Sequence, residues 1–120
     1  MYITRDDYMN FSGIDLQIEL RGTATDNPSR AVEIFIERVE GWVLDYLAYK
    51  YNLTTAHEEF DATVFGNAVL HQIDYIRRNG ELSIDTVPAG KVLAPNAYNV
   101  LKAGGMCNSV HHRVEDILWQ

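Results

Sequence analysis

The sequence predicts a mainly α protein, a small helical bundle around one long central helix with a short β-hairpin or small antiparallel sheet. Apolar residues recur at helical spacing over Asn27–Tyr51 and again over about residues 61–79, but alternate with polar residues over Ile14–Leu20. With 120 residues, 47% of them hydrophobic, the chain is long enough for one domain with a real core.

The segment Asn27–Tyr51 is the predicted central helix. Asn27 is a favourable N-cap, and Pro28 suits the first helical position, where its missing N–H costs nothing. Spacings of three, four and seven residues place its large apolar side chains on one broad face. The predicted core residues on that face are Val32, Phe35, Ile36, Val39, Trp42, Val43, Tyr46 and Leu47.

A thinner apolar stripe lies on the back of the same predicted helix. At about 100° per residue, Ile34, Gly41, Leu44 and Ala48 cluster roughly opposite the main face. A helix that is partly apolar on both sides needs a second neighbour, either another part of the chain or another copy of it. We expect this stripe to form a subunit interface, flanked by acidic residues that discourage non-specific association, namely Glu33, Glu37 and Glu40.

The segments before the central helix predict a short helix and then a strand. Thr4 and Asp7 resemble a capping box, which indicates a helix over about residues 5–11. The strict alternation over Ile14–Leu20 would place its four apolar side chains on one face of a strand. A lone strand needs a partner, which the two short strands predicted within Glu81–Ala94 could supply.

Two further helices are predicted after the central one. Asp61 or Thr63 can cap a helix that runs to about Asn79, with core positions at Phe65, Val69, Ile73 and Ile76. A shorter helix follows over Pro95–Ala103. Gly41 and Gly66 each lie inside a predicted helix, where glycine is either tolerated or permits close approach of another backbone.

We expect one helical domain over residues 1–105 and a C-terminal tail or arm over residues 106–120. The tail carries apolar residues at helical spacing and is the candidate segment for contacting a partner or an adjacent copy. The candidate contact residues are Val110, Val114, Ile117, Leu118 and Trp119.

Charge and composition argue against several classes of function. A net charge of −7 and a pI of about 4.9 argue against nucleic-acid binding through a basic face. No apolar run is long enough to span a membrane, and no signal peptide is recognisable, so a cytoplasmic site of synthesis is expected. Cys107 is alone, so it cannot form an intrachain disulfide.

No catalytic, cofactor-binding or metal-binding motif stands out, and we expect a protein that is not an enzyme and holds no cofactor. His71 and Asp74 have a spacing that could hold a metal, but a site needs three or four ligands. A polar contact at the edge of the core is the simpler interpretation of this pair.

Several segments together resemble the head–tail connector, or adaptor, family of tailed phages, over roughly residues 1–105. They are Tyr2-Ile3-Thr4 with Asp7-Tyr8, WVLDYLAYKY at 42–51, HQIDYIRRNG at 71–80, Leu82-Ser83-Ile84, and Leu93-Ala94-Pro95 leading to Tyr98, Leu101 and Gly104-Gly105. The chain departs from the family pattern in the alternating Ile14–Leu20 and in its longer tail after Gly105.

The resemblance implies a structural virion protein without catalytic residues. It would join the capsid portal to the tail in the virion neck as a dodecameric ring, made in the host cytoplasm. Its partners would be further copies of itself, the portal protein and tail or stopper proteins. DNA would pass through the channel without sequence-specific binding, and no membrane would be involved. The alternative is a small cytoplasmic helical module that binds a partner or regulates it.

Overall fold

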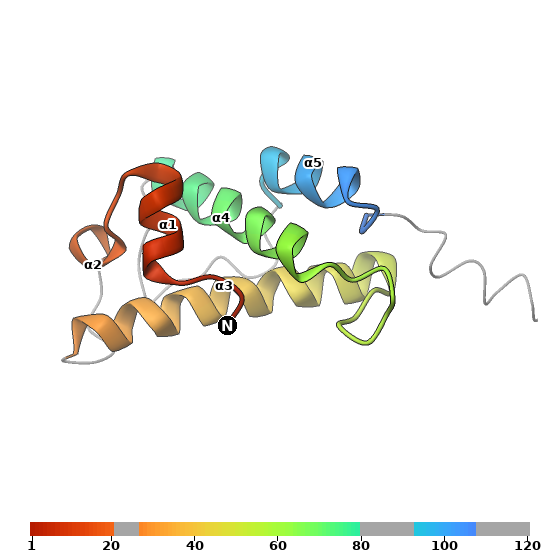
Figure 1. Cartoon of the computed structure of the whole chain (residues 1–120), viewed down its shortest axis with the longest axis horizontal. Helices are drawn as coiled ribbons and strands as arrows, with labels where there is room; N and C mark the ends of the chain where they lie inside the picture. The colour runs from red at the N-terminus through yellow and green to blue at the C-terminus, as the bar shows by residue number, and fades with distance from the viewer. Residues whose placement is uncertain (21–26, 80–92, 108–120) are drawn as a thin grey trace, which may run out of the picture.

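Five α-helices make up the part of the chain that the computed structural model describes, which is residues 1–20, 27–79 and 93–107 (Figure 1). In chain order they are α1 (Arg5–Ser12), α2 (Leu16–Glu19), α3 (Pro28–Tyr51), α4 (Ala62–Arg78) and α5 (Pro95–Ala103). None of the described residues forms a strand. The predicted mainly α class is therefore confirmed, whereas the predicted hairpin lies almost entirely outside the described residues.

Helix α3 is the longest element and runs along one side of the others. Helices α2 and α4 lie against it, α1 packs on α2 and α4, and α5 packs on α4 (Figure 1). None of the helices in the described ranges has the length and hydrophobicity needed to cross a bilayer.

Local capping explains where the main helices begin. Thr4 and Asp7 form the complete capping box at the start of α1. Asn27 accepts hydrogen bonds from the backbone of Ser29 and Arg30 at the start of α3, and Pro28 is its first residue. Asp61, rather than Thr63, caps α4. These helix starts are encoded within a few residues of each boundary.

The predicted strand over Ile14–Leu20 is wrong, because the segment contains the four-residue helix α2. Asp15 caps this helix by accepting from the backbone N–H of Gln17, and it also pairs with Arg5. Leu16 is fully buried while Ile18 is 81% exposed, so the two side chains do not share a face. A tertiary ion pair and a local cap therefore prevail over the alternation of apolar residues.

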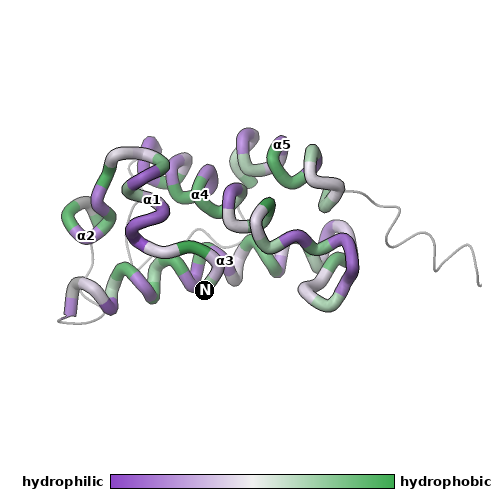
Figure 2. The backbone as a smooth tube through the Cα atoms, in the orientation of Figure 1, coloured by the Kyte–Doolittle hydropathy of each residue, from purple (hydrophilic) through white to green (hydrophobic). Residues whose placement is uncertain are grey.

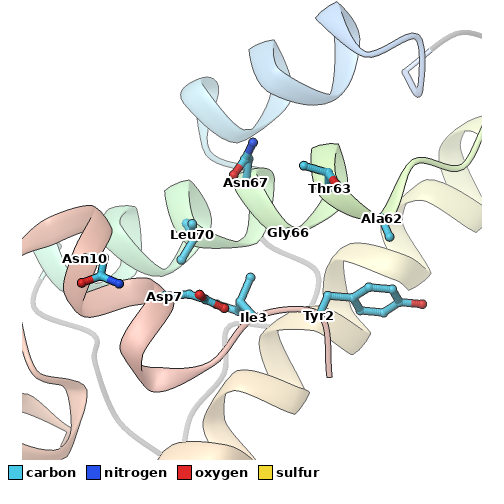
Figure 3. Close-up of a pocket in the computed structure, with 9 residues that line it drawn as sticks. All are labelled: Tyr2, Ile3, Asp7, Asn10, Ala62, Thr63, Gly66, Asn67 and Leu70. Atoms are coloured by element: carbon cyan, nitrogen blue, oxygen red, sulfur yellow. The ribbon is translucent and has the colours of Figure 1, made fainter.

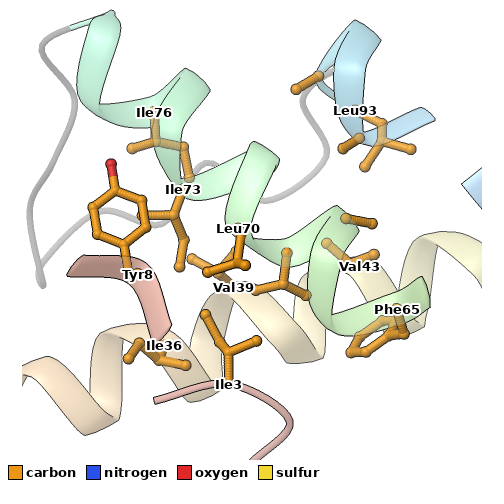
Figure 4. Packing of buried hydrophobic residues seen from close by; sticks show 14 of the residues in the cluster. Ile3, Tyr8, Ile36, Val39, Val43, Phe65, Leu70, Ile73, Ile76 and Leu93 are labelled. Carbon is orange, nitrogen blue, oxygen red and sulfur yellow. The ribbon is translucent and has the colours of Figure 1, made fainter. Parts of the chain in front are cut away.

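The hydrophobic core lies between α3 and α4, with contributions from α1 and the chain start (Figure 4). Along α3 and α4, hydrophobic residues alternate with hydrophilic ones (Figure 2). Most of the residues predicted to form the core are buried, namely Val32, Phe35, Ile36, Val39, Val43, Leu47, Phe65, Val69, Ile73 and Ile76.

Trp42 and Tyr46 are only partly buried, in contrast to the predicted core position of both. Their rings pack on one another at the edge of the core, with centroids 5.9 Å apart. Glu40, predicted to flank an exposed stripe, is instead buried with 4% of its surface exposed. Compared with the predicted core face, the buried face of α3 thus includes Glu40 and leaves Trp42 at its edge. Glu40 is buried because backbone groups inside the fold donate hydrogen bonds to it.

The start of α5 is fixed by a contact with α4 rather than by a cap of its own. Its N-cap position, Ala94, makes no side-chain capping bond. The Ala94 backbone N–H donates to the buried side-chain oxygen of Gln72 on α4 at 2.8 Å. Gln72 is therefore a buried polar residue with a satisfied acceptor, and it sets where α5 begins on α4.

Candidate functional site

The back of α3 carries the residues predicted to form a subunit interface, Ile34, Gly41, Leu44 and Ala48, which we call the outer stripe. Ala48 is exposed, and Ile34 and Gly41 are partly exposed. Leu44 differs, because it packs against the core cluster. A Cβ atom added at Gly41 would meet no atom within 4 Å, so the space above this glycine is open. Among the described residues, Gly41 serves no close approach.

The surroundings of the outer stripe are polar and charged. Arg30 and Glu33 form an exposed ion pair at 2.9 Å, and Glu37 and Asp45 are exposed along the same helix. Tyr49, next to Ala48, is 91% exposed. A small apolar strip with a polar rim and a free aromatic ring has the composition of a protein contact surface.

Glu40 holds the chain start in place. Its Oε2 atom accepts hydrogen bonds from the backbone N–H of Tyr2 at 2.6 Å and of Ile3 at 3.0 Å. Burial raises the pKa of this carboxyl group, although the two backbone N–H groups and the nearby α-amino group act in the opposite direction. The sequence analysis does not predict this role. The signal was present, because Ile36, Val43 and Leu47 lie on the same side of the helix as Glu40 and are buried.

A hollow of about 370 Å³ lies between the chain start, α1 and α4 (Figure 3). It is lined by Tyr2, Ile3, Asp7, Asn10, Ala62, Thr63, Gly66, Asn67 and Leu70. Asp7 is the one carboxylate in this lining, and it already accepts from the backbone N–H of Thr4 at 2.8 Å. The lining of the hollow therefore lacks a set of opposed acid–base groups.

His71 and Asp74, the pair with metal-like spacing, have separate partners. The His71 ring packs edge-on against Phe11, with centroids 4.9 Å apart. Asp74 bonds to Tyr8, Arg77 and Arg78. Burial acts to raise the pKa of Asp74, but these partners outweigh it, so its pKa lies below the ordinary value. No group of three or more His, Cys, Asp or Glu side chains in the described part of the chain could hold a metal.

Cys107 lies half-buried beside Tyr51, beyond the end of α5. Burial raises the pKa of its thiol to about 11, and burial also raises the pKa of Tyr51. A thiol with a raised pKa is protonated at neutral pH and is a weak nucleophile. Cys107 and Tyr51 therefore lie at the rim of the core.

The predicted tail contacts, from Val110 to Trp119, lie outside the described residues. Comparisons with protein families, with curated proteins and with solved structures find no match to this chain. The residues themselves therefore carry the functional argument.

Proposed function

We propose that the chain is a structural head–tail connector of a tailed phage, which assembles as a ring around the DNA channel between portal and tail. In this role it is a non-catalytic virion protein of the neck. Its partners are neighbouring copies, the portal protein and tail or stopper proteins. The motifs that resemble the connector family motivate this assignment, and the helical fold is compatible with it.

The observation that carries the proposal is the open outer stripe on α3. Ile34, Gly41 and Ala48 recur every seven residues and leave a small, partly apolar strip along the helix. In a closed ring each subunit presents one surface to a different surface of the next copy, and an accessible strip on a single chain would serve as one of these surfaces. The open space above Gly41 would admit a neighbouring helix at short distance.

The acidity of the chain also supports a channel-forming role. The net charge of −7 suits a wall past which DNA slides, because dense phosphate contacts would hold it. A portal ring would raise the local concentration of subunits and so promote assembly even where the contact between two copies is weak. The free protein is then expected to be monomeric or weakly associated.

The test uses Gly41→Arg and Ala48→Arg, with Asn99→Arg as the matched control. All three add one cation to a helix, and Asn99 is an exposed residue of α5, away from α3. Purified proteins are mixed with portal rings and examined by negative-stain imaging and light scattering. The stripe variants should keep the wild-type melting temperature and fail to join the ring, whereas the control joins.

Ring assembly by both stripe variants at the wild-type level would refute the assigned interface. A wild-type protein that stays a monomer or dimer with every portal ring tried would refute the connector function. That second result would favour a small helical module that binds a partner of another kind.

A further inference from the structure

Residues Met1–Ile3, here called the strap, precede Thr4, the N-cap of α1, and lie against α3 and α4. Ile3 points between the two helices and is 3% exposed (Figure 4). The Tyr2 ring packs edge-on against Phe65 and Phe60, with centroids 4.9 and 5.8 Å apart. The strap therefore covers part of the seam between α3 and α4.

One side chain provides the polar anchor of the strap on α3. The backbone N–H groups of Tyr2 and Ile3 both donate to the same Glu40 oxygen. Glu40 is a carboxylate buried in an apolar setting, which carries a desolvation cost while the strap is closed. Opening of the strap would return the Glu40 carboxylate to water. The free energy of its hydration would offset part of the stabilisation lost when Ile3 is exposed.

Helix α1 is attached independently of the strap. The Tyr8 hydroxyl bonds to Asp74 and Arg77 on α4, and Arg5 pairs with Asp15 through two bonds of 2.8 and 2.7 Å. Thr4 marks the boundary, because its backbone is extended while its side chain caps α1. The strap can thus leave while α1 stays bound.

Close packing of the strap against Gly66 on α4 also affects whether the strap stays closed. A Cβ atom at this position would lie 3.2 Å from Cγ2 of Ile3 and 3.6 Å from the Tyr2 carbonyl oxygen. Glycine in the middle of α4 costs helix stability, and here it makes room for the closed strap.

We propose that Met1–Ile3 is a detachable strap, which opens as a unit while the helices stay folded, and that Glu40 sets how often it is closed. Tyr2 and Ile3 also form one wall of the hollow beside α1 and α4 (Figure 3). Opening would join that hollow to the α3–α4 seam and expose Phe60 and Phe65.

Amide hydrogen exchange of the whole chain tests the strap directly. The Ile3 amide should exchange with a protection factor at least a hundredfold lower than the core amides of Val69 and Ile73. Glu40→Ala should lower Ile3 protection at least tenfold further and leave the ratio of α4 protection to global stability unchanged. Glu37→Ala, an exposed acidic position one turn away, should change neither.

Gly66→Ala separates strap opening from general destabilisation. Alanine favours the helix, so α4 protection should stay the same or rise, while the crowded Ile3 amide loses protection at least threefold. Equal protection of Ile3 and the α4 core in the wild type would overturn the proposal, since the strap would then open only by global unfolding. So would a Gly66→Ala protein in which Ile3 protection rises together with that of α4.

Discussion

The hydroxyl of Tyr8 and the carboxylate of Asp74, 66 positions apart in sequence, lie within hydrogen-bond distance at 3.2 Å. The same hydroxyl accepts from Nε of Arg77 at 3.1 Å. Tyr8 is completely buried, so this small network places a polar group at the end of an apolar ring. The network joins α1 to α4, and removal of the Tyr8 hydroxyl oxygen tests how much it stabilises the fold.

Tyr8→Phe should lower the free energy of unfolding by about 1 kcal/mol, the net value of a typical buried hydrogen bond. The ring keeps its packing, and Asp74 keeps both arginines. Tyr75→Phe is the control, because the Tyr75 ring is exposed and should change stability by less than about 0.5 kcal/mol. Urea denaturation of the three proteins measures the difference, and equal losses in both variants would contradict the assigned network.

Leu16→Ala and Ile18→Ala distinguish helix α2 from the strand that the alternation predicts. In the structure Leu16 is buried and Ile18 is exposed, so the first change should cost about 2–5 kcal/mol and the second less than about 0.5 kcal/mol. A strand with both residues on its inner face would give similar losses. Thermal melts of the two variants therefore test the short helix directly.

Phe35→Ala should destabilise the protein more than Trp42→Ala, although tryptophan is the larger residue. Phe35 is fully buried, which predicts a loss of about 3–5 kcal/mol. Trp42 lies at the edge of the core, and roughly half of that loss is expected for it. Chemical denaturation provides the comparison, and a larger loss for Trp42→Ala would place its ring inside the core.

The raised pKa of Glu40 predicts how stability depends on pH. Because burial raises this pKa in the folded state, the contribution of Glu40 is largest below its ordinary pKa and falls as pH rises through the folded value. Glu37 and the α-amino group of Met1 are the other charges that act on it. Asp15 and Asp74 have lowered pKa values, so their contributions are lost only in stronger acid.

Comparison with Glu40→Gln isolates this effect, because glutamine has the same shape and does not titrate. The wild-type protein should gain stability relative to Glu40→Gln as pH falls from neutral toward the ordinary carboxyl pKa of 4.5. Denaturant midpoints at matched pH values measure the difference. A difference that stays constant, or that moves the other way, would show that burial of Glu40 does not govern its ionisation.

Local signals explain what the sequence predicts correctly. Asn27 with Pro28, Asp61, and Thr4 with Asp7 define helix starts within a few residues, and long periodic apolar patterns define the helices that follow. The failures depend on hydrogen bonds and ion pairs that the pattern of apolar residues does not show. Ile14–Leu20 alternates like a strand, but Arg5 and the Asp15 cap favour a helical turn.

Contacts between residues far apart in the sequence also explain why the candidate interface on α3 could be predicted only in part. Periodicity locates the back of α3, where Gly41 and Ala48 are indeed accessible, but it cannot fix the rotation of the helix to within one residue. That rotation depends on Glu40 meeting the strap, a contact 37 positions apart in sequence. As a result Leu44 turns partly inward and Trp42 partly outward.

The uncapped start of α5 also implies an order of events during folding. Helices α3 and α4 carry their own caps, whereas the nine-residue α5 is shorter than the roughly 12–15 residues that isolated helices need in water. Its first bond to the rest of the protein requires Gln72 to be in place on α4. We therefore expect α5 to form only after α4 has formed, with low φ-values for its side chains in the folding transition state. Since α4 also precedes α5 in the chain, the surface that α5 needs leaves the ribosome first.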